Sequence, residues 1–109
     1  MTQYARGRRK EWDVVKRLRA DGWLAQRSAG SHGLWDVVAV KPGHRARLIQ
    51  VKYSRDGAFR RDENASALLA LAANDAVVDV EVWVYRYGRS YPTRWEVSYL
   101  HDWIITGGA

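Results

Sequence analysis

Apolar residues follow two spacings along this chain: a helical spacing of three or four residues, and the strict alternation of a half-buried strand. The segments follow the order α-β-β-β-α-β-β, which predicts an α/β fold with a mixed five-stranded sheet flanked by helices. We expect helices at residues 8–21 and 62–73, and strands at residues 23–28, 34–40, 46–53, 77–85 and 94–99. A chain of 109 residues has room for one core, so residues 1–109 should form a single domain, with flexible ends at 1–6 and 106–109.

Single residues mark the ends and faces of these elements. Asp21-Gly22 should end the first helix after its apolar stripe. Asp62 is of a type favoured at helix N-caps, and we expect it to cap the second helix. From Val78 to Val84 every second residue is valine, so the strand at 77–85 should have one apolar face.

The strands at 34–40 and 46–53 are joined by a short Pro-Gly loop, which is typical of a β-hairpin. Residues two apart share a face of a strand, so Gln50 and Lys52 should lie on one face of the second strand. Asp36 should lie among valines on one face of the first strand. Burying such polar groups costs on the order of 1–3 kcal/mol each unless they find partners or an ion. A metal-dependent active site would explain why they interrupt an apolar hairpin.

Composition limits the classes of function. The chain contains no cysteine, which excludes disulfides, zinc–thiolate sites and cysteine nucleophiles. It contains no apolar run of the roughly 20 residues that span a membrane, and its N-terminus leads into no signal-peptide core, so we expect a cytoplasmic protein. Its net charge of +6 favours a polyanionic partner such as nucleic acid, although a basic surface kept for solubility explains the charge equally well.

Two further candidate regions lie outside the hairpin. Glu11 precedes two apolar positions by three and four residues, so it belongs to the apolar stripe of the first helix. The alternative is an ordinary first-turn glutamate, favoured by the helix dipole. Ser31 and His32 lie in a small polar loop, where they can donate hydrogen bonds to a ligand, but the same composition is common in plain connecting turns. His32 is more simply a substrate contact or a bystander than a metal ligand.

Taken together, the unusual positions are Glu11, Ser31, Asp36, Gln50 and Lys52. Oxygen ligands suit Mg²⁺, which typically takes one or two carboxylates and keeps several waters. Such a metal polarises a phosphoryl group and lowers the pKa of its bound water. A lysine beside it can hold the scissile phosphate, orient the attacking water or help to deprotonate it. These residue types therefore indicate phosphodiester hydrolysis.

The order and spacing of these residues resemble the restriction-endonuclease-like superfamily, whose core motif is PD-(D/E)XK. Within that superfamily the chain is similar to the archaeal-type Holliday junction resolvases over roughly residues 7–99. Each short motif is weak alone, whereas their order and spacing in a domain of this size are more specific. The matching pieces are Gly7-x-x-x-Glu11, Gly22-Trp23, Arg27-Ser28-Ala29-Gly30-Ser31, Trp35-Asp36-Val37-Val38-Ala39 and Gln50-Val51-Lys52.

The resemblance implies a homodimer that binds four-way DNA junctions and nicks two opposing strands. It implies that Glu11 and Asp36 contribute to a Mg²⁺ site, at which Mn²⁺ should substitute. Lys52 would then be the catalytic lysine, and Ser31 would lie near the scissile phosphate. For the dimer contact we expect exposed apolar residues, with Leu100, Trp103, Ile104, Ile105 and part of the helix face at 68–71 as candidates.

Two departures from the family pattern are visible. Trp35 stands where the family usually has proline, and this should alter only the entry to the strand. Gln50 replaces the customary acid, which removes one negative ligand. A glutamine carbonyl oxygen can still coordinate a metal, so we expect Gln50 to be a third, weaker ligand.

Three hypotheses of function follow. The first is a metal-dependent structure-selective DNA endonuclease that resolves four-way (Holliday) junctions by paired nicks. The second is another nuclease of this fold, such as a repair nickase or a restriction-type enzyme, but the chain has no recognition-helix motif for base-specific readout. The third is a non-catalytic nucleic-acid-binding module, for which loss of Asp36 or Lys52 would have been expected. DNA contacts are predicted at Arg8, Arg9, Lys10, Ser31, His32, Arg55, Arg60 and Arg61.

Overall fold

The computed structural model describes residues 3–28, 34–74, 78–97 and 102–107, which form two helices and one six-stranded sheet. The elements are α1 (Gln3–Ala20), β1 (Leu24–Arg27), β2 (Val37–Val40), β3 (Ala46–Ser54), α2 (Glu63–Asn74), β4 (Val78–Arg86), β5 (Thr93–Val97) and β6 (Trp103–Gly107). The strands lie in the sheet in the order of the sequence, from β1 at one edge to β6 at the other. Neither described helix combines the length and apolar character needed to cross a membrane.

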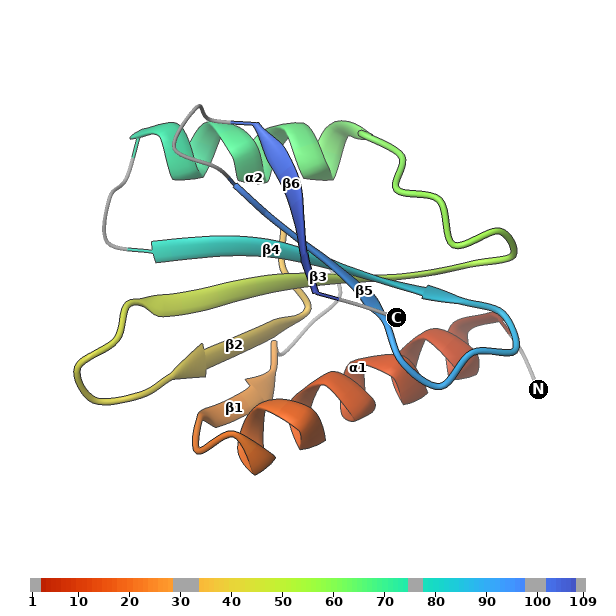
Figure 1. The fold of residues 1–109 in the computed structure, drawn as a ribbon, viewed down its shortest axis with the longest axis horizontal. Helices are drawn as coiled ribbons and strands as arrows, with labels where there is room; N and C mark the ends of the chain where they lie inside the picture. The colour runs from red at the N-terminus through yellow and green to blue at the C-terminus, as the bar shows by residue number, and fades with distance from the viewer. Residues whose placement is uncertain (1–2, 29–33, 75–77, 98–101, 108–109) are drawn as a thin grey trace.

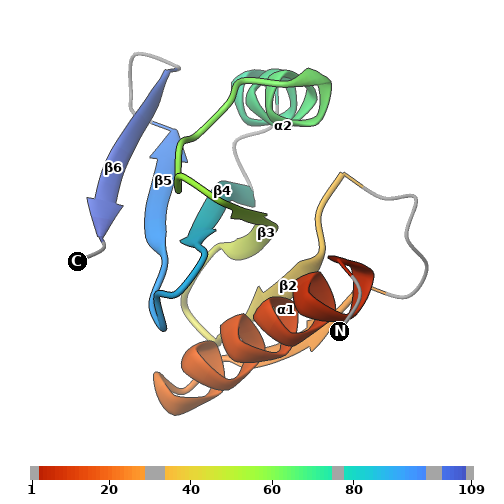
Figure 2. The same cartoon turned by 90° about the vertical axis from the view of Figure 1, so that its right-hand side faces the viewer.

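The central pair of strands is parallel, and every other neighbouring pair is antiparallel. β3 and β4 pair over nine residues, and α2 forms the crossover between them. Figure 1 shows α1 and α2 on opposite faces of the sheet, and Figure 2 shows the same two layers from the side. The mixed α/β architecture predicted from the sequence is therefore confirmed.

Each helix covers one face with a small set of buried side chains. α1 packs on β1, β2 and β3 through Val14, Val15 and Leu18, which are at most 1% exposed. This is the apolar stripe that the sequence predicted. α2 packs on β4 through Ala65 and Leu68, both fully buried.

β4 is the strand that connects the two halves of the core, because it is buried on both faces. The predicted valine face is confirmed: Val80, Val82 and Val84 lie in the cluster under α2. The opposite face carries Trp83 and Tyr85, which lie in the cluster under α1. Two-sided burial is typical of a strand in a parallel pair covered by helices on both faces.

The predicted count of five strands was wrong. A sixth strand, β6, pairs antiparallel with β5, with an irregularity in register between Arg94 and Trp95. The sequence did not predict this strand, because only three apolar residues follow one another at 103–105, too few to show an alternation. Pairing buries Trp103 to 4% exposure against the α2 side of the core.

This burial corrects part of the predicted dimer surface. Trp103 and Leu68 pack inside the protomer and have almost no exposed surface to offer a partner. Ile104 and Ile105 are exposed by 45% and 59%. Leu100 lies outside the described residues.

The boundaries of several elements differ from those predicted: β2 begins at Val37 rather than at residue 34, and the largest difference is in α1. α1 begins at Gln3 rather than near residue 8, because the alanine, arginine and lysine that surround Gly7 are good helix formers. Residues 3–6 and 106–107, predicted as parts of flexible ends, thus lie within α1 and β6.

The predicted N-cap of α2 is confirmed: the Ala65 amide donates to Asp62 Oδ1 at 2.9 Å, a bond that typically contributes about 1 kcal/mol.

A buried ion pair on the α1 face was not predicted. Glu81 is 1% exposed and accepts two hydrogen bonds from the Arg47 guanidinium, at 2.6 and 2.7 Å. The indole N–H of Trp83 donates to the same carboxylate at 2.9 Å. Because alternation places Glu81 on the inner face of β4, its charge must be paired in this way for the sheet to fold.

Removal of this carboxylate should cost much more stability than removal of its exposed neighbour. We expect Glu81→Ala to lower the free energy of unfolding by about 3–5 kcal/mol, because the largely buried Arg47 guanidinium, 15% exposed, loses its partner carboxylate. Asp79→Ala is the matched control, since it breaks a pair with Arg45 in which both side chains are 49% exposed, and it should cost about 1 kcal/mol or less. Urea denaturation followed by tryptophan fluorescence measures both values, and equal losses would contradict the assignment.

Candidate active site

Asp36 lies at the point where β2 and β3 stop pairing. The last paired residues are Val37 and Ile49, and Asp36 directly precedes this pair. The Asp36 amide donates to the Ile49 carbonyl at 2.8 Å, and the next donor of β3, the Val51 amide, donates to Asp36 Oδ2 at 2.8 Å. The carboxylate therefore replaces the next rung of the ladder, and this fixes its position at the end of the strand.

The electrostatic environment of Asp36 shows which charges surround it. Burial raises the pKa of Asp36, and the Glu11 carboxylate raises it further. The hydrogen bond from Val51 and the positive charges of Lys52 and Arg27 lower the pKa, but the net shift is upward. Glu11, Lys52 and Arg27 thus lie close enough to Asp36 for their charges to act on it, although they come from three different elements.

Glu11 is held by Arg27, a residue that the sequence analysis treated only as part of a motif. Arg27 Nε donates to Glu11 Oε1 at 3.1 Å, and both side chains are less than a third exposed. The guanidinium also lies 5.5 Å from the centre of the Trp12 ring. Glu11 therefore turns toward the sheet, as its position on the apolar stripe predicted. An arginine in an edge strand gave no signal that it would hold this carboxylate.

Gln50 is the most unusual side chain of the hairpin. It is 5% exposed, on the sheet face of Leu48, as the sequence predicted. Its Oε1 atom is the one buried side-chain polar atom of the described residues that has no hydrogen-bond partner. An unpaired buried acceptor typically costs about 1–3 kcal/mol, so a cation beside it would relieve an existing penalty.

Lys52 follows on the same face and forms an ion pair with Asp62. Partial burial raises the pKa of Asp62, but the hydrogen bonds from Lys52 and the Ala65 amide outweigh burial and the net shift is downward. Asp62 therefore stays ionised at neutral pH. The sequence predicted Asp62 as a helix cap and gave no sign of its contact with Lys52.

The family model described as archaeal Holliday junction resolvase matches residues 2–87. The chain belongs to the archaeal Holliday junction resolvase family. No curated protein sequence matches it. Among solved structures, Hjc of Archaeoglobus fulgidus, a Holliday junction resolvase from an archaeal hyperthermophile, matches with a TM-score of 0.63 at 23% identity, covering 82% of this chain and 74% of that one. At this identity the match supports the fold.

The donor set of this resolvase is sparse. Among the described residues, no three histidine, aspartate or glutamate side chains gather into a group that could hold a metal ion. Glu11, Asp36 and the unpartnered Gln50 oxygen still offer two carboxylates and one neutral oxygen. This set fits Mg²⁺, which binds through one or two carboxylates and completes its shell with water and phosphate oxygens.

The basic residues predicted to contact DNA differ in their surroundings. Arg8, Arg9 and Arg55 are exposed. Arg60 and Arg61 are also exposed, and they form ion pairs with nearby aspartates at 2.8 and 3.4 Å. Lys10 lies over the rings of Tyr53 and Tyr85, at 5.3 and 4.9 Å. Ser31 and His32 lie outside the described residues.

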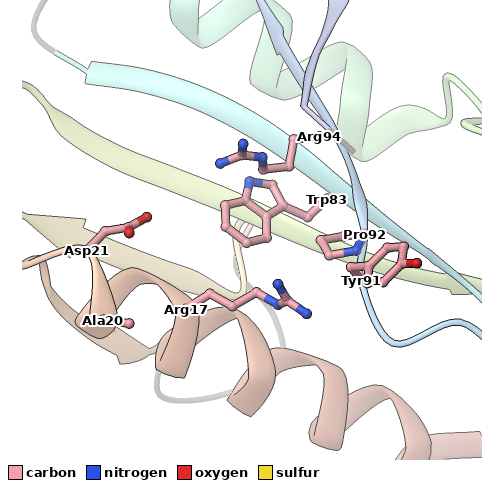
Figure 3. Close-up of a pocket in the computed structure, with 7 residues that line it drawn as sticks. All are labelled: Arg17, Ala20, Asp21, Trp83, Tyr91, Pro92 and Arg94. Atoms are coloured by element: carbon pink, nitrogen blue, oxygen red, sulfur yellow. The ribbon is translucent and has the colours of Figure 1, made fainter. Parts of the chain in front are cut away.

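A separate hollow lies on the α1 face of the resolvase (Figure 3), and none of the residues lining it is a candidate catalytic residue. The Arg94 guanidinium lies 5.3 Å from the centre of the Trp83 ring, and Arg17 pairs with Asp13 at 2.8 Å. Both arginines of the hollow thus have partners within the fold. The hollow is lined by Arg17, Ala20, Asp21, Trp83, Tyr91, Pro92 and Arg94.

The raised pKa of Asp36 predicts a pH-dependent difference between the resolvase and its Asp36→Asn variant. A carboxyl whose pKa lies above 3.8 in the folded state gives stability that is present below 3.8 and lost as the pH rises through the folded value. Asparagine is neutral and its Oδ1 can still accept from Val51. We therefore expect Asp36→Asn to be more stable than the wild type at pH 7, with the difference vanishing near and below pH 3.8.

Thermal unfolding of both proteins over a pH series measures this difference directly. Acid also removes the stability contributed by carboxylates with a lowered pKa, such as Asp13 and Asp62. This loss is the same in both proteins, so it cancels when their stabilities are compared. A variant that is less stable than the wild type at pH 7, or a difference that does not change with pH, would show that Asp36 carries no burial penalty.

Proposed function

We propose that this chain is a metal-dependent, structure-selective DNA endonuclease that resolves four-way junctions by paired nicks. The observation that carries the proposal is the convergence of Glu11, Asp36, Gln50 and Lys52 at the end of the β2–β3 ladder, in a member of the resolvase family. The A. fulgidus protein of the same fold is a Holliday junction resolvase, which supports the same substrate for this chain.

In the proposed mechanism Asp36, Glu11 and Gln50 would hold Mg²⁺, with Mn²⁺ as a substitute. When bound, the ion supplies polarisation of the phosphoryl group and a lowered pKa of coordinated water. The Val51 amide fixes the Asp36 carboxylate, and Arg27 fixes that of Glu11, so the donors need little rearrangement when the substrate arrives. Lys52 donates to a non-bridging oxygen of the scissile phosphate and stabilises the charge that develops there. Ser31 is proposed to contact the same phosphate.

Selectivity for a junction is proposed to come from its shape and its phosphates rather than from base sequence. The net charge of +6 favours a polyanion, and the exposed Arg8, Arg9 and Arg55 have room to contact phosphates. Arg60 and Arg61 can exchange their aspartate partners for phosphate oxygens. Lys10 and His32 complete the proposed DNA-contacting set.

A homodimer is proposed because two opposing strands must be cut at two active sites, and this chain supplies one. Ile104 and Ile105 are the predicted interface residues that stay exposed after the fold has formed. They lie on β6 at the free edge of the sheet, which is also able to pair with another strand.

Loss of the charge of Asp36 or of Lys52 should stop cleavage but preserve binding of the junction. We expect Asp36→Asn and Lys52→Ala to cleave a four-way junction at least about 100-fold more slowly than the wild type in Mg²⁺, with junction affinity within about threefold. The gel assay should include nicked and linear duplexes of the same sequence as well as the junction.

The pattern of products separates the alternative functions. Equal cleavage of linear duplex and junction would favour another nuclease of this fold. Junction binding without cleavage by the wild type at any Mg²⁺ or Mn²⁺ concentration would indicate a non-catalytic module. Full activity of either variant, or of the wild type in excess chelator, would refute the assigned chemistry.

Gln50 should control how much metal the reaction needs. A neutral oxygen attracts a divalent cation less than a carboxylate does, so we expect Gln50→Glu to lower the Mg²⁺ concentration for half-maximal cleavage, on the order of tenfold. Gln50→Ala should raise that concentration or abolish activity. Mg²⁺ titrations of the three proteins, with melting temperatures alongside, measure both effects. The same metal dependence in all three would show that Gln50 is a packing residue and not a ligand.

A further inference from the structure

The contact between Lys52 and Asp62 joins the candidate site to helix α2. The two oxygens of the Asp62 carboxylate have different partners: Oδ1 accepts from the Ala65 amide at 2.9 Å, and Oδ2 accepts from the Lys52 ammonium. The Asp62 carbonyl also accepts the first helical hydrogen bond, from Ser66 at 3.0 Å. One residue thus caps the helix and holds the lysine at the same time.

The start of α2 is a rigid support for such a contact. Ala65 and Leu68 are fully buried against the valines of β4, so the first turn of the helix cannot shift without opening the core. The Asp62 side chain is restrained further by its own cap bond. The Lys52 side chain, by contrast, is about 30% exposed and has a flexible four-carbon stem.

Other groups on this face do not restrain the lysine in the same way. Gln50 precedes it by two residues but carries no charge. Asp36 attracts Lys52 electrostatically, yet the hydrogen bond of its Oδ2 goes to Val51. Among the described residues, Asp62 is the carboxylate that forms an ion pair with Lys52.

We propose that Asp62 is a positioning residue for DNA cleavage: it holds the Lys52 ammonium at the end of β3, where the scissile phosphate is received. The inference rests on the proposed role of Lys52. Asp62 itself touches neither the substrate nor a metal in this scheme. It acts by limiting the conformations of the lysine, and preorganisation of a reacting group is a large source of rate.

Substitution of Asp62 can separate this role from helix capping. Asparagine is as good an N-cap as aspartate, so Asp62→Asn keeps the bond to Ala65 and loses only the charge that pairs with Lys52. Glutamate keeps the charge and the reach toward Lys52 but is a poor N-cap. Glu63→Gln is the matched control, because it removes an exposed carboxylate from the same helix terminus.

The readouts are the single-turnover cleavage rate at saturating protein and Mg²⁺, the junction Kd and the melting temperature. We expect Asp62→Asn to cleave the four-way junction about tenfold more slowly than the wild type, with an unchanged melting temperature and an equal or tighter Kd. Asp62→Glu should melt at a lower temperature but cleave faster than Asp62→Asn. Glu63→Gln should cleave at the wild-type rate.

Other outcomes overturn the inference in distinguishable ways. A wild-type rate for Asp62→Asn, with Lys52→Ala inactive, would leave the role of Lys52 standing and remove that of Asp62. Rates that follow the melting temperatures, with Asp62→Glu slower than Asp62→Asn, would reduce Asp62 to a helix cap. A wild-type rate for Lys52→Ala would overturn the proposed function of the lysine and the inference with it.

Discussion

The parallel pairing of β3 with β4 is the constraint on which most of this structure depends. Parallel neighbours cannot be joined by a tight turn, because the chain leaves the first strand at the far end of the sheet from the start of the second. The return path is the segment 55–62 followed by α2, which runs back across the sheet (Figure 1). This path covers one face of β4 and brings the N-cap of α2, Asp62, beside Lys52 near the end of β3.

Glu81 in β4 and Asp36 at the start of the β2–β3 hairpin are both withdrawn from solvent, but their surroundings differ. Glu81 has its charge fully paired by Arg47 and a further hydrogen bond from Trp83, so it belongs to the stable core. Asp36 receives one backbone hydrogen bond, and its pKa is raised by burial and by Glu11. A hairpin selected for stability alone would carry an apolar side chain in place of the Asp36 carboxylate. The proposed role of Asp36 at the active site would account for the cost of burying its carboxylate.

Gln50 is a second buried polar group near Asp36 whose burial is not fully compensated. Its buried oxygen lacks a partner, and the residue carries no charge of its own. A site with two carboxylates and one neutral oxygen should attract a cation weakly until the DNA phosphate adds further negative charge. On the proposed function, the metal would therefore bind most tightly when the DNA substrate is in place.

Much of this arrangement was determined by local sequence. The alternation of apolar residues placed Gln50 and Lys52 on one face of their strand, and the residue type of Asp62 identified a helix cap. These features depend on the periods of strands and helices, which are set by the backbone and are visible within ten or so residues. The resemblance to the family added the expectation that Glu11 of α1 and Asp36 of the hairpin belong to one site.

The tertiary structure alone decided which distant groups meet. The pairs Glu11–Arg27 and Lys52–Asp62 depend on how α1 and α2 lie across the sheet, and the pair Arg47–Glu81 depends on the register of two parallel strands. The sixth strand formed because β5 offered a free edge, a condition that the short apolar run in β6 does not reveal. Local patterns fix the direction of a side chain relative to its own element, whereas its partner is fixed by the path of the chain between elements.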